Sequence, residues 1–156
     1  MTKTHKDSLF RSILNHEKPL LQIYNALRRT HYSAEQAEIV INTLGETLWT
    51  AKKNDISFSV NNELIVMLEH QSTINENMPL RFLQIITRLF ENQIENKKDL
   101  YKQKQIKLQR PIFVVFYIGK APFPPFKIMR LSDAFKDVAG FEGITLELEA
   151  WVFNIK

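Results

Sequence analysis

The stretch Asn-Asp-Ile-Ser-Phe-Ser-Val-Asn-Asn-Glu-Leu-Ile-Val-Met-Leu-Glu-His-Gln, residues 54–71, decides the fold. Apolar residues alternate with serines before the paired asparagines, and aliphatic residues follow them, which predicts two short strands joined by a polar turn. Asp55 begins the first strand, Glu69 ends the second, and Gln71 follows two positions later. Two acids at the open end of a hairpin can hold a divalent cation if both lie on one face.

The length of the turn decides whether the two acids share a face. A turn of two residues, 61–62, pairs Val60 with Glu63, and the acid at the end of the second strand then faces away from Asp55. This register also puts Glu63 on the same face as the apolar residues of the first strand.

A turn of three residues, 61–63, pairs Val60 with Leu64 and Asp55 with Glu69 instead. Asn tolerates the left-handed backbone that such a loop needs. Because this register gathers the apolar side chains, we predict the three-residue turn. The predicted apolar face then holds Ile56, Phe58, Val60, Leu64, Val66 and Leu68, and the other face holds Asp55, Ser57, Ser59, Ile65, Met67, Glu69 and Gln71.

The composition indicates a single globular domain over residues 1–156, in which 44% apolar residues and eleven Phe suffice for one core. The formal net charge of +4 is compatible with a nucleic-acid partner but does not require one. The chain has no Cys, which excludes disulfides and thiolate metal sites. The longest apolar run, 112–118, is too short to cross a bilayer, and the N-terminus lacks the apolar core of a signal peptide. We therefore expect a cytoplasmic protein with no membrane association.

Hydrophobic periodicity predicts helices and strands on both sides of the hairpin. Residues 33–44 fit two interpretations, because Ser33 and Gln36 look like a capping box whereas Ile39-Val40-Ile41 is β-branched. Residues 95–110 are polar and basic, and we expect a solvated helix and connector there. The remaining predicted helices are 7–14, 19–29, 79–94 and a short one at 131–138, and the remaining strands are 46–51, 112–118 and 144–155. This mixture predicts an α/β or α+β class.

The helix over 79–94 carries two features of interest. Arg81 and Arg88, seven residues apart, share one face. Another face is predicted to be buried and is made of Leu80, Leu83, Ile86, Phe90 and Ile94, widened by Phe82, Ile85 and Leu89.

The order helix, strand, acid-bearing hairpin, helix, strand resembles the PD-(D/E)XK nuclease superfamily, whose fold is the restriction-endonuclease-like core with a mixed central sheet flanked by helices. In that superfamily an acid begins the second strand, and an acid-x-Lys signature ends the third. Here the signature reads Glu69-His70-Gln71, with Gln in place of Lys. The chain resembles one family in particular, the bacterial transposase-like, recombination-promoting nucleases. The stretches that carry this resemblance are Ile23-Tyr24-Asn25-Ala26-Leu27, residues 53–58, the thirteen-residue run from Glu69 to Arg81, and Leu131-Ser132-Asp133-Ala134-Phe135.

The resemblance implies a DNA endonuclease that depends on Mg²⁺, for which Mn²⁺ substitutes, and that uses no small-molecule cofactor. It assigns Asp55 and Glu69 to metal binding and catalysis, and adds the backbone carbonyl of His70 as a metal ligand. Gln71 is the third catalytic residue; it keeps a donor and an acceptor but no charge, so we expect it to orient a water. Additional site candidates are Asp7 and Arg81, and the candidate DNA-binding residues are Lys52, Lys53, Arg81 and Arg88.

Alternatives remain open on the sequence. A nuclease that cuts both strands of DNA needs two sites, which a homodimer supplies. Gln71 in place of Lys also fits a catalytically weakened or inactive relative that binds DNA or regulates a partner. A third interpretation is an interaction domain in which Asp55 and Glu69 are ordinary strand-end charges. The lysines between 97 and 107 are either a solvated face or a track for the DNA backbone.

Overall fold

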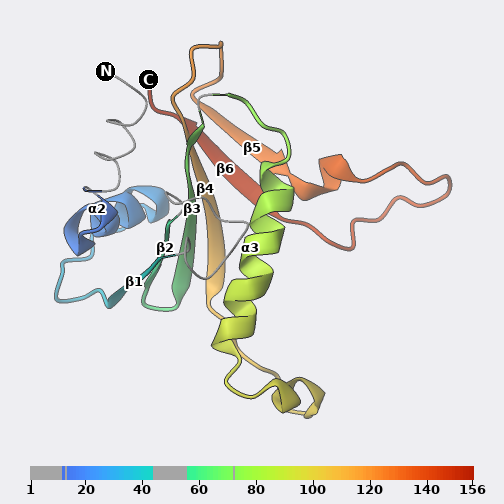
Figure 1. Ribbon diagram of the computed structural model, residues 1–156, viewed down its shortest axis with the longest axis horizontal. Helices are drawn as coiled ribbons and strands as arrows, with labels where there is room; N and C mark the ends of the chain where they lie inside the picture. Colours follow the sequence, from blue (N-terminus) through green and yellow to red (C-terminus); the bar gives the residue numbers. More distant parts are fainter. Residues whose placement is uncertain (1–11, 13, 44–55, 72) are drawn as a thin grey trace. The chain divides into compact units, whose positions relative to one another are not determined.

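The computed structural model describes residues 12, 14–43, 56–71 and 73–156, with the backbone alone at 43 and 67–71. The chain divides into two compact units, Met1–Met67 with Gln109–Ile112 and Leu68–Leu108 with Phe113–Lys156. Figure 1 shows the elements, which in chain order are α2 (Glu17–Arg28), β1 (Ile39–Thr43), β2 (Ile56–Val60), β3 (Glu63–Gln71), α3 (Met78–Gln93), the 3-10 helix η1 (Lys97–Tyr101), β4 (Arg110–Tyr117), β5 (Phe126–Arg130), the 3-10 helix η2 (Leu131–Ala134) and β6 (Glu149–Asn154). The single-domain organisation stays a prediction.

The described strands form one six-stranded sheet in the order β1-β2-β3-β4-β6-β5. Strand β2 is antiparallel to both β1 and β3, β4 is parallel to β6, and β5 is antiparallel to β6. The turn before β3 is joined to the first residue of β4, because the Arg110 amide donates to the Asn62 carbonyl at 3.0 Å. The sheet is therefore mixed, and the predicted α+β class is confirmed.

In the first unit, α2 packs on β1 and β2. It buries Leu20, Leu21 and Tyr24. The helix ends where Arg29 takes a left-handed conformation with φ 55°, and the Arg29 amide donates to the Asn25 carbonyl. The helix begins two residues before Pro19, which therefore occupies its first turn, where a missing amide hydrogen costs nothing.

The hairpin of β2 and β3 has the two-residue turn, so the predicted three-residue register is wrong. Val60 pairs with Glu63, Ile56 pairs with Met67, and Asn61 takes the left-handed conformation with φ 54°. Two neighbours hold this turn. Asn61 exchanges two hydrogen bonds with the backbone of Glu38, at 3.0 and 3.2 Å, and the Asn62 carbonyl accepts from the first residue of β4.

The prediction failed because it required Glu63 to lie away from the apolar face of β2. Glu63 does lie on that face, but its carboxylate accepts a hydrogen bond from the Tyr24 hydroxyl at 3.0 Å and pairs with Arg28 Nε at 2.9 Å. The carboxylate is thus satisfied by α2. Both faces of the hairpin are covered, since all five residues of β2 are buried, serines included. Alternation of apolar and polar residues therefore carries little information about this register.

The described residues between α2 and β2 form a turn and the strand β1. The β-branched residues form β1 from Ile39, and residues 34–36 form a turn, in which the Ser33 amide donates to Gln36 Oε1 at 3.0 Å. The capping-box pair is therefore present without a helix. The predicted strand 46–51 lies outside the described residues, as does most of the predicted helix 7–14.

In the second unit, α3 packs on β5 and β6. The helix lies where the sequence predicts it, but its buried face is rotated: Leu80 is 44% exposed, and Leu83, Phe90 and Ile94 are half-buried. The Phe82 ring is fully buried, with its centroid 4.9 Å from that of Phe113. The residues that α3 buries are Met78, Pro79, Phe82, Ile85 and Ile86.

The predicted strand 112–118 is confirmed as β4. This strand lies between β3 and β6 in the sheet, which agrees with the burial of most of its residues. The helix predicted over 131–138 is only the 3-10 helix η2, since Phe135 is already extended. The last strand, predicted over 144–155, is β6 and begins only at Glu149. Glu149 pairs with Arg130, the last residue of β5, so β6 has no β5 partner before this position. Within the described ranges, the structure has no helix that is long and apolar enough to cross a membrane.

Candidate functional site

The structure places the predicted site residues unevenly. Asp7, Lys52, Lys53 and Asp55 lie outside the described residues. The signature at 69–71 forms the last part of β3, with its backbone alone described. Arg81 and Arg88 lie on α3. The predicted metal site therefore falls outside the part of the chain whose side chains the structure describes.

The register of the hairpin bears directly on the metal pair. Asp55 was predicted opposite Glu69 only with a three-residue turn, and the hairpin has the two-residue turn, in which Val60 pairs with Glu63. The observed register runs from the pair Val60–Glu63 to the pair Ile56–Met67. In this register Asp55 and Glu69 were expected to lie on opposite faces. Among the residues with described side chains, no three of His, Cys, Asp or Glu gather in a group that could hold a metal ion.

The segment between β3 and α3 forms an ordered turn. The Asn75 side chain accepts from the Asn77 amide at 3.0 Å, and the Asn77 carbonyl accepts from the Arg81 amide at 3.1 Å. Asn77 is the residue before the helix, but its side chain makes no capping hydrogen bond, and Pro79 lies in the first turn. The helix therefore starts within one residue of the predicted position, and the Asn75 side chain closes the turn before it.

An ion pair joins this turn to β5. Lys127 Nζ lies 3.1 and 3.3 Å from the two carboxylate oxygens of Glu76. Both side chains are partly exposed, so the pair contributes about 0–1 kcal/mol to stability. Its main effect is to give the turn after β3 a defined position within the second unit.

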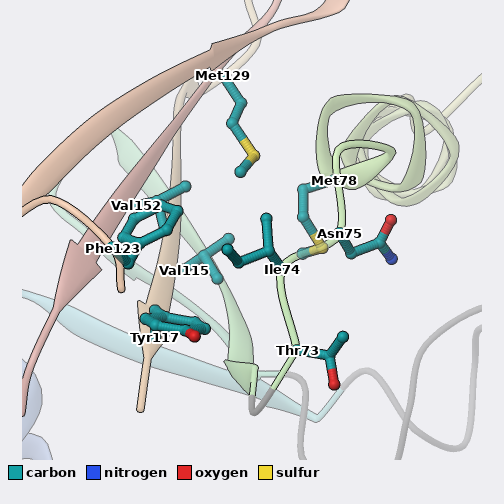
Figure 2. Close-up of a pocket in the computed structure, with 9 residues that line it drawn as sticks. All are labelled: Thr73, Ile74, Asn75, Met78, Val115, Tyr117, Phe123, Met129 and Val152. Carbon is teal, nitrogen blue, oxygen red and sulfur yellow. The ribbon is translucent and has the colours of Figure 1, made fainter. Parts of the chain in front are cut away.

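A small hollow lies under the same turn (Figure 2). Its volume is about 10 Å³, roughly one water molecule, so it cannot hold a substrate. Figure 2 shows the apolar side chains of Ile74 and Met78 toward the hollow and the amide of Asn75 turned away from it. The hollow is lined by Thr73, Ile74, Asn75, Met78, Val115, Tyr117, Phe123, Met129 and Val152. It is a packing contact between the turn and the strands of the second unit.

Two cations follow that turn along α3. Arg81 is half-buried, with Nη1 3.6 Å from the sulfur of Met78, and Arg88 is exposed. Seven residues are close to two helical turns, so both lie on one side of α3, about 10 Å apart along its axis. This spacing confirms the shared face predicted from the sequence and provides two cations beside the segment that follows β3.

The sequence analysis missed one polar cluster, in the first unit. The Tyr24 hydroxyl and Arg28 both meet the carboxylate of Glu63. Burial raises the pKa of the Tyr24 phenol, and the hydrogen bond to Glu63 raises it further. The spacing of Tyr24 and Arg28, one turn apart on the same helix, was the available signal, but nothing local connects them with Glu63. The cluster holds the register of the hairpin.

No protein-family model, curated protein or solved structure matches this chain.

Proposed function

We propose that the chain is a metal-dependent DNA endonuclease of the transposase-like, recombination-promoting type, acting in the cytoplasm as a homodimer. One observation supports the proposal above the others: the described elements follow the order helix, strand, hairpin, helix, strand, with β4 next to β3 in the sheet. This is the order on which the resemblance to the PD-(D/E)XK nucleases depends. In this order Glu69-His70-Gln71 are the last residues of β3, and the next helix of the chain is α3.

The proposed chemistry is hydrolysis of a phosphodiester. Asp55, Glu69 and the carbonyl of His70 would hold Mg²⁺ or Mn²⁺, because hard divalent cations prefer oxygen ligands. When bound, the metal would supply an acidified water and neutralise charge on the phosphate. Gln71 would orient the attacking water, since its amide both donates and accepts hydrogen bonds but carries no charge. Arg81 and Arg88, with Lys52 and Lys53, would contact the DNA backbone, and Asp7 would be an additional acid.

The proposal makes a demand on the hairpin. In the observed register, Asp55 and Glu69 share a face only if the pairing shifts by one residue beyond the pair Ile56–Met67. A β-bulge produces such a shift, because it sets two residues of one strand against one residue of the other. Bulges occur next to active sites, where they redirect a side chain. The proposed metal site therefore implies a bulge between Met67 and Glu69.

The observed register also favours a second candidate function. Without that bulge the two acids do not converge, and the chain would be a relative that binds DNA or regulates a nuclease without cutting. Gln71 in place of Lys agrees with this alternative, because a charge that contacts the nucleophile or the phosphate is absent.

Nicking of a supercoiled plasmid tests both candidates. We expect nicking with Mg²⁺ or Mn²⁺ and none with EDTA. Asp55→Ala and Glu69→Ala should each reduce the rate by at least about 100-fold, since each removes a ligand of the metal. Glu142→Ala, which removes an exposed acid from the loop before β6, is the matched control and should cut at the wild-type rate. Gln71→Lys should cut faster than the wild type, and Gln71→Ala more slowly.

The outcomes separate the candidates. Cutting that persists in both Asp55→Ala and Glu69→Ala would remove the assigned site. Salt-sensitive DNA binding with no cutting under any metal would establish the second candidate. A chain that neither cuts nor binds DNA would leave the interaction-domain interpretation.

A further inference from the structure

Residues 95–108, here called the basic segment, extend beyond the end of α3 (Figure 1). The segment is built by local hydrogen bonds: the Asn96 side chain accepts from the Lys98 amide at 3.0 Å, and the Asn96 carbonyl accepts from Asp99 at 2.9 Å. These bonds form η1, which ends where the Lys102 amide donates to the Asp99 carbonyl at 3.2 Å. Residues 96–102 of the segment therefore have a defined backbone before any partner binds.

The basic segment carries most of the excess charge of the chain. It has five lysines and two acids, a formal charge of +3, whereas the whole chain has +4. One of its acids, Asp99, is paired with Lys102 at 2.6 Å. Lys97, Lys98 and Lys104 form no ion pair with another described residue and are exposed. Three ammonium groups on one short segment repel each other, so a polyanion that neutralises them gains affinity.

An aromatic ring and an open hollow accompany these charges. Tyr101 is 91% exposed, so its ring is open to a stacking partner. The next residue, Lys102, lines a hollow of about 370 Å³. The lining is mostly cationic and amide side chains: Asp99, Lys102, Lys104, Gln105, Ile106 and Lys107.

We propose that the basic segment binds a single strand of nucleic acid, with phosphates on the lysines and an unpaired base stacked on Tyr101. Sites for single strands combine a cationic groove with an exposed aromatic ring, because every base has a face that can stack. The amide oxygen of Gln105 accepts from Lys107 Nζ at 2.9 Å, and its NH₂ group adds a donor suited to base edges. This inference deepens the proposed nuclease function, since it adds a contact for the same substrate, but its test needs no cleavage.

The position of the basic segment makes it a separate site. Helix α3 has sixteen residues and is about 24 Å long, and the segment follows its last turn, whereas the signature at 69–71 comes before its first. The segment would therefore hold the strand about one helix length from the cutting site.

An anionic membrane would attract the same lysines, but the rest of the segment fits it poorly. Binding at a membrane surface requires a continuous apolar face beside the cationic one. Here the exposed Leu100 and Tyr101 are followed by the polar run from Lys102 to Gln105, which interrupts any apolar face before the exposed Leu108. The amides of Gln103 and Gln105 would lose their hydrogen bonds in the acyl layer. A nucleic acid can satisfy those amides.

Fluorescence anisotropy with a labelled 20-nucleotide oligo-dT, in EDTA and over 50–200 mM NaCl, tests the proposal. The variant Lys97→Gln/Lys98→Gln/Lys104→Gln should reduce the slope of log affinity against log salt by about 2, because each phosphate contact on a single strand contributes about 0.7. The matched control Lys18→Gln/Lys120→Gln/Lys136→Gln removes three exposed lysines elsewhere and should keep the slope.

Two further variants test the stacked base. Tyr101→Ala should weaken binding by about 5-fold or more, since stacking on an aromatic ring contributes about 1–3 kcal/mol per base. Phe141→Ala, which removes another exposed ring, should bind like the wild type. A duplex of equal length should lose little on Tyr101→Ala, because its bases are already stacked.

Three results would overturn the proposal. The first is wild-type affinity for oligo-dT in both the triple-lysine variant and Tyr101→Ala, and the second is an equal loss of affinity in the matched controls. The third is capture of the protein by vesicles containing phosphatidylserine that oligo-dT does not reverse. Glu69→Ala should bind oligo-dT like the wild type. A failure of cleavage is thereby distinguished from a failure of this contact.

Discussion

The hairpin of β2 and β3 and the helix α3 were both predicted from apolar spacing, and both occur where the spacing places them. They differ in how the structure departs from the expected orientation. The hairpin is shifted by one residue, and the shift moves every following side chain of β3 to the other face. Helix α3 is only rotated, so Ile86 is buried as expected while Leu80 is exposed.

The difference follows from the two periodicities. A strand has two faces, so a one-residue error reverses the whole face. A helix has 3.6 residues per turn, so a similar error turns its buried stripe partway round and leaves neighbouring positions still buried. The consequence for function is unequal as well. A rotation of α3 keeps Arg81 and Arg88 on one side, whereas the shift in the hairpin removes the simple argument that Asp55 and Glu69 meet.

The largest effect is expected in α3, where a paired substitution tests the rotation. Phe82→Ala should reduce the free energy of unfolding by about 3–5 kcal/mol, because it removes a fully buried ring that packs against Phe113. Leu80→Ala should cost only about 0.5 kcal/mol, because that side chain is already 44% exposed. Urea denaturation measures both. Equal losses would mean that α3 presents the face first predicted from the sequence.

A smaller effect is expected in the hairpin, where Glu63 tests the observed register. Glu63→Ala should cost about 1–3 kcal/mol, because the partly buried Tyr24 hydroxyl and Arg28 lose their partner. Glu149→Ala is the control: it breaks an exposed pair with Arg130 and should cost at most about 1 kcal/mol. If both variants unfold at the same urea concentration, Glu63 does not anchor the turn.

The smallest effect is a pH dependence of the same cluster. Because burial and Glu63 raise the pKa of Tyr24 above its usual value near 10, the folded chain holds the phenol proton more tightly than the unfolded chain. This contribution to stability is fully present below pH 10 and is lost as the pH rises through the raised pKa. Tyr24→Phe should therefore lose less stability than the wild type between pH 9 and 11, as followed by urea denaturation. Parallel curves for the two proteins would contradict the role of Tyr24.

The sequence could predict which residues are candidates for the site, but not whether their side chains meet. The stretch 54–71 shows an acid before one strand and an acid near the end of the next, and both strands exist. Whether those acids converge depends on pairing, and pairing depends on contacts that no window of sequence contains. The basic segment is the opposite case: its charge is evident in the sequence, while the hollow beside it and the exposure of Tyr101 needed the structure.

The sequence alone determined which segments become helices or strands over most of the described chain, because apolar spacing and Pro or Asn signals act over a few residues. It also determined the mixed class and the position of the basic segment. The tertiary structure alone decided the register of β2 and β3, because Glu63 is satisfied by Tyr24 and Arg28 on a helix that lies 35 to 39 positions earlier. A partly buried carboxylate is tolerated only where such partners exist, and that is a property of the packed chain.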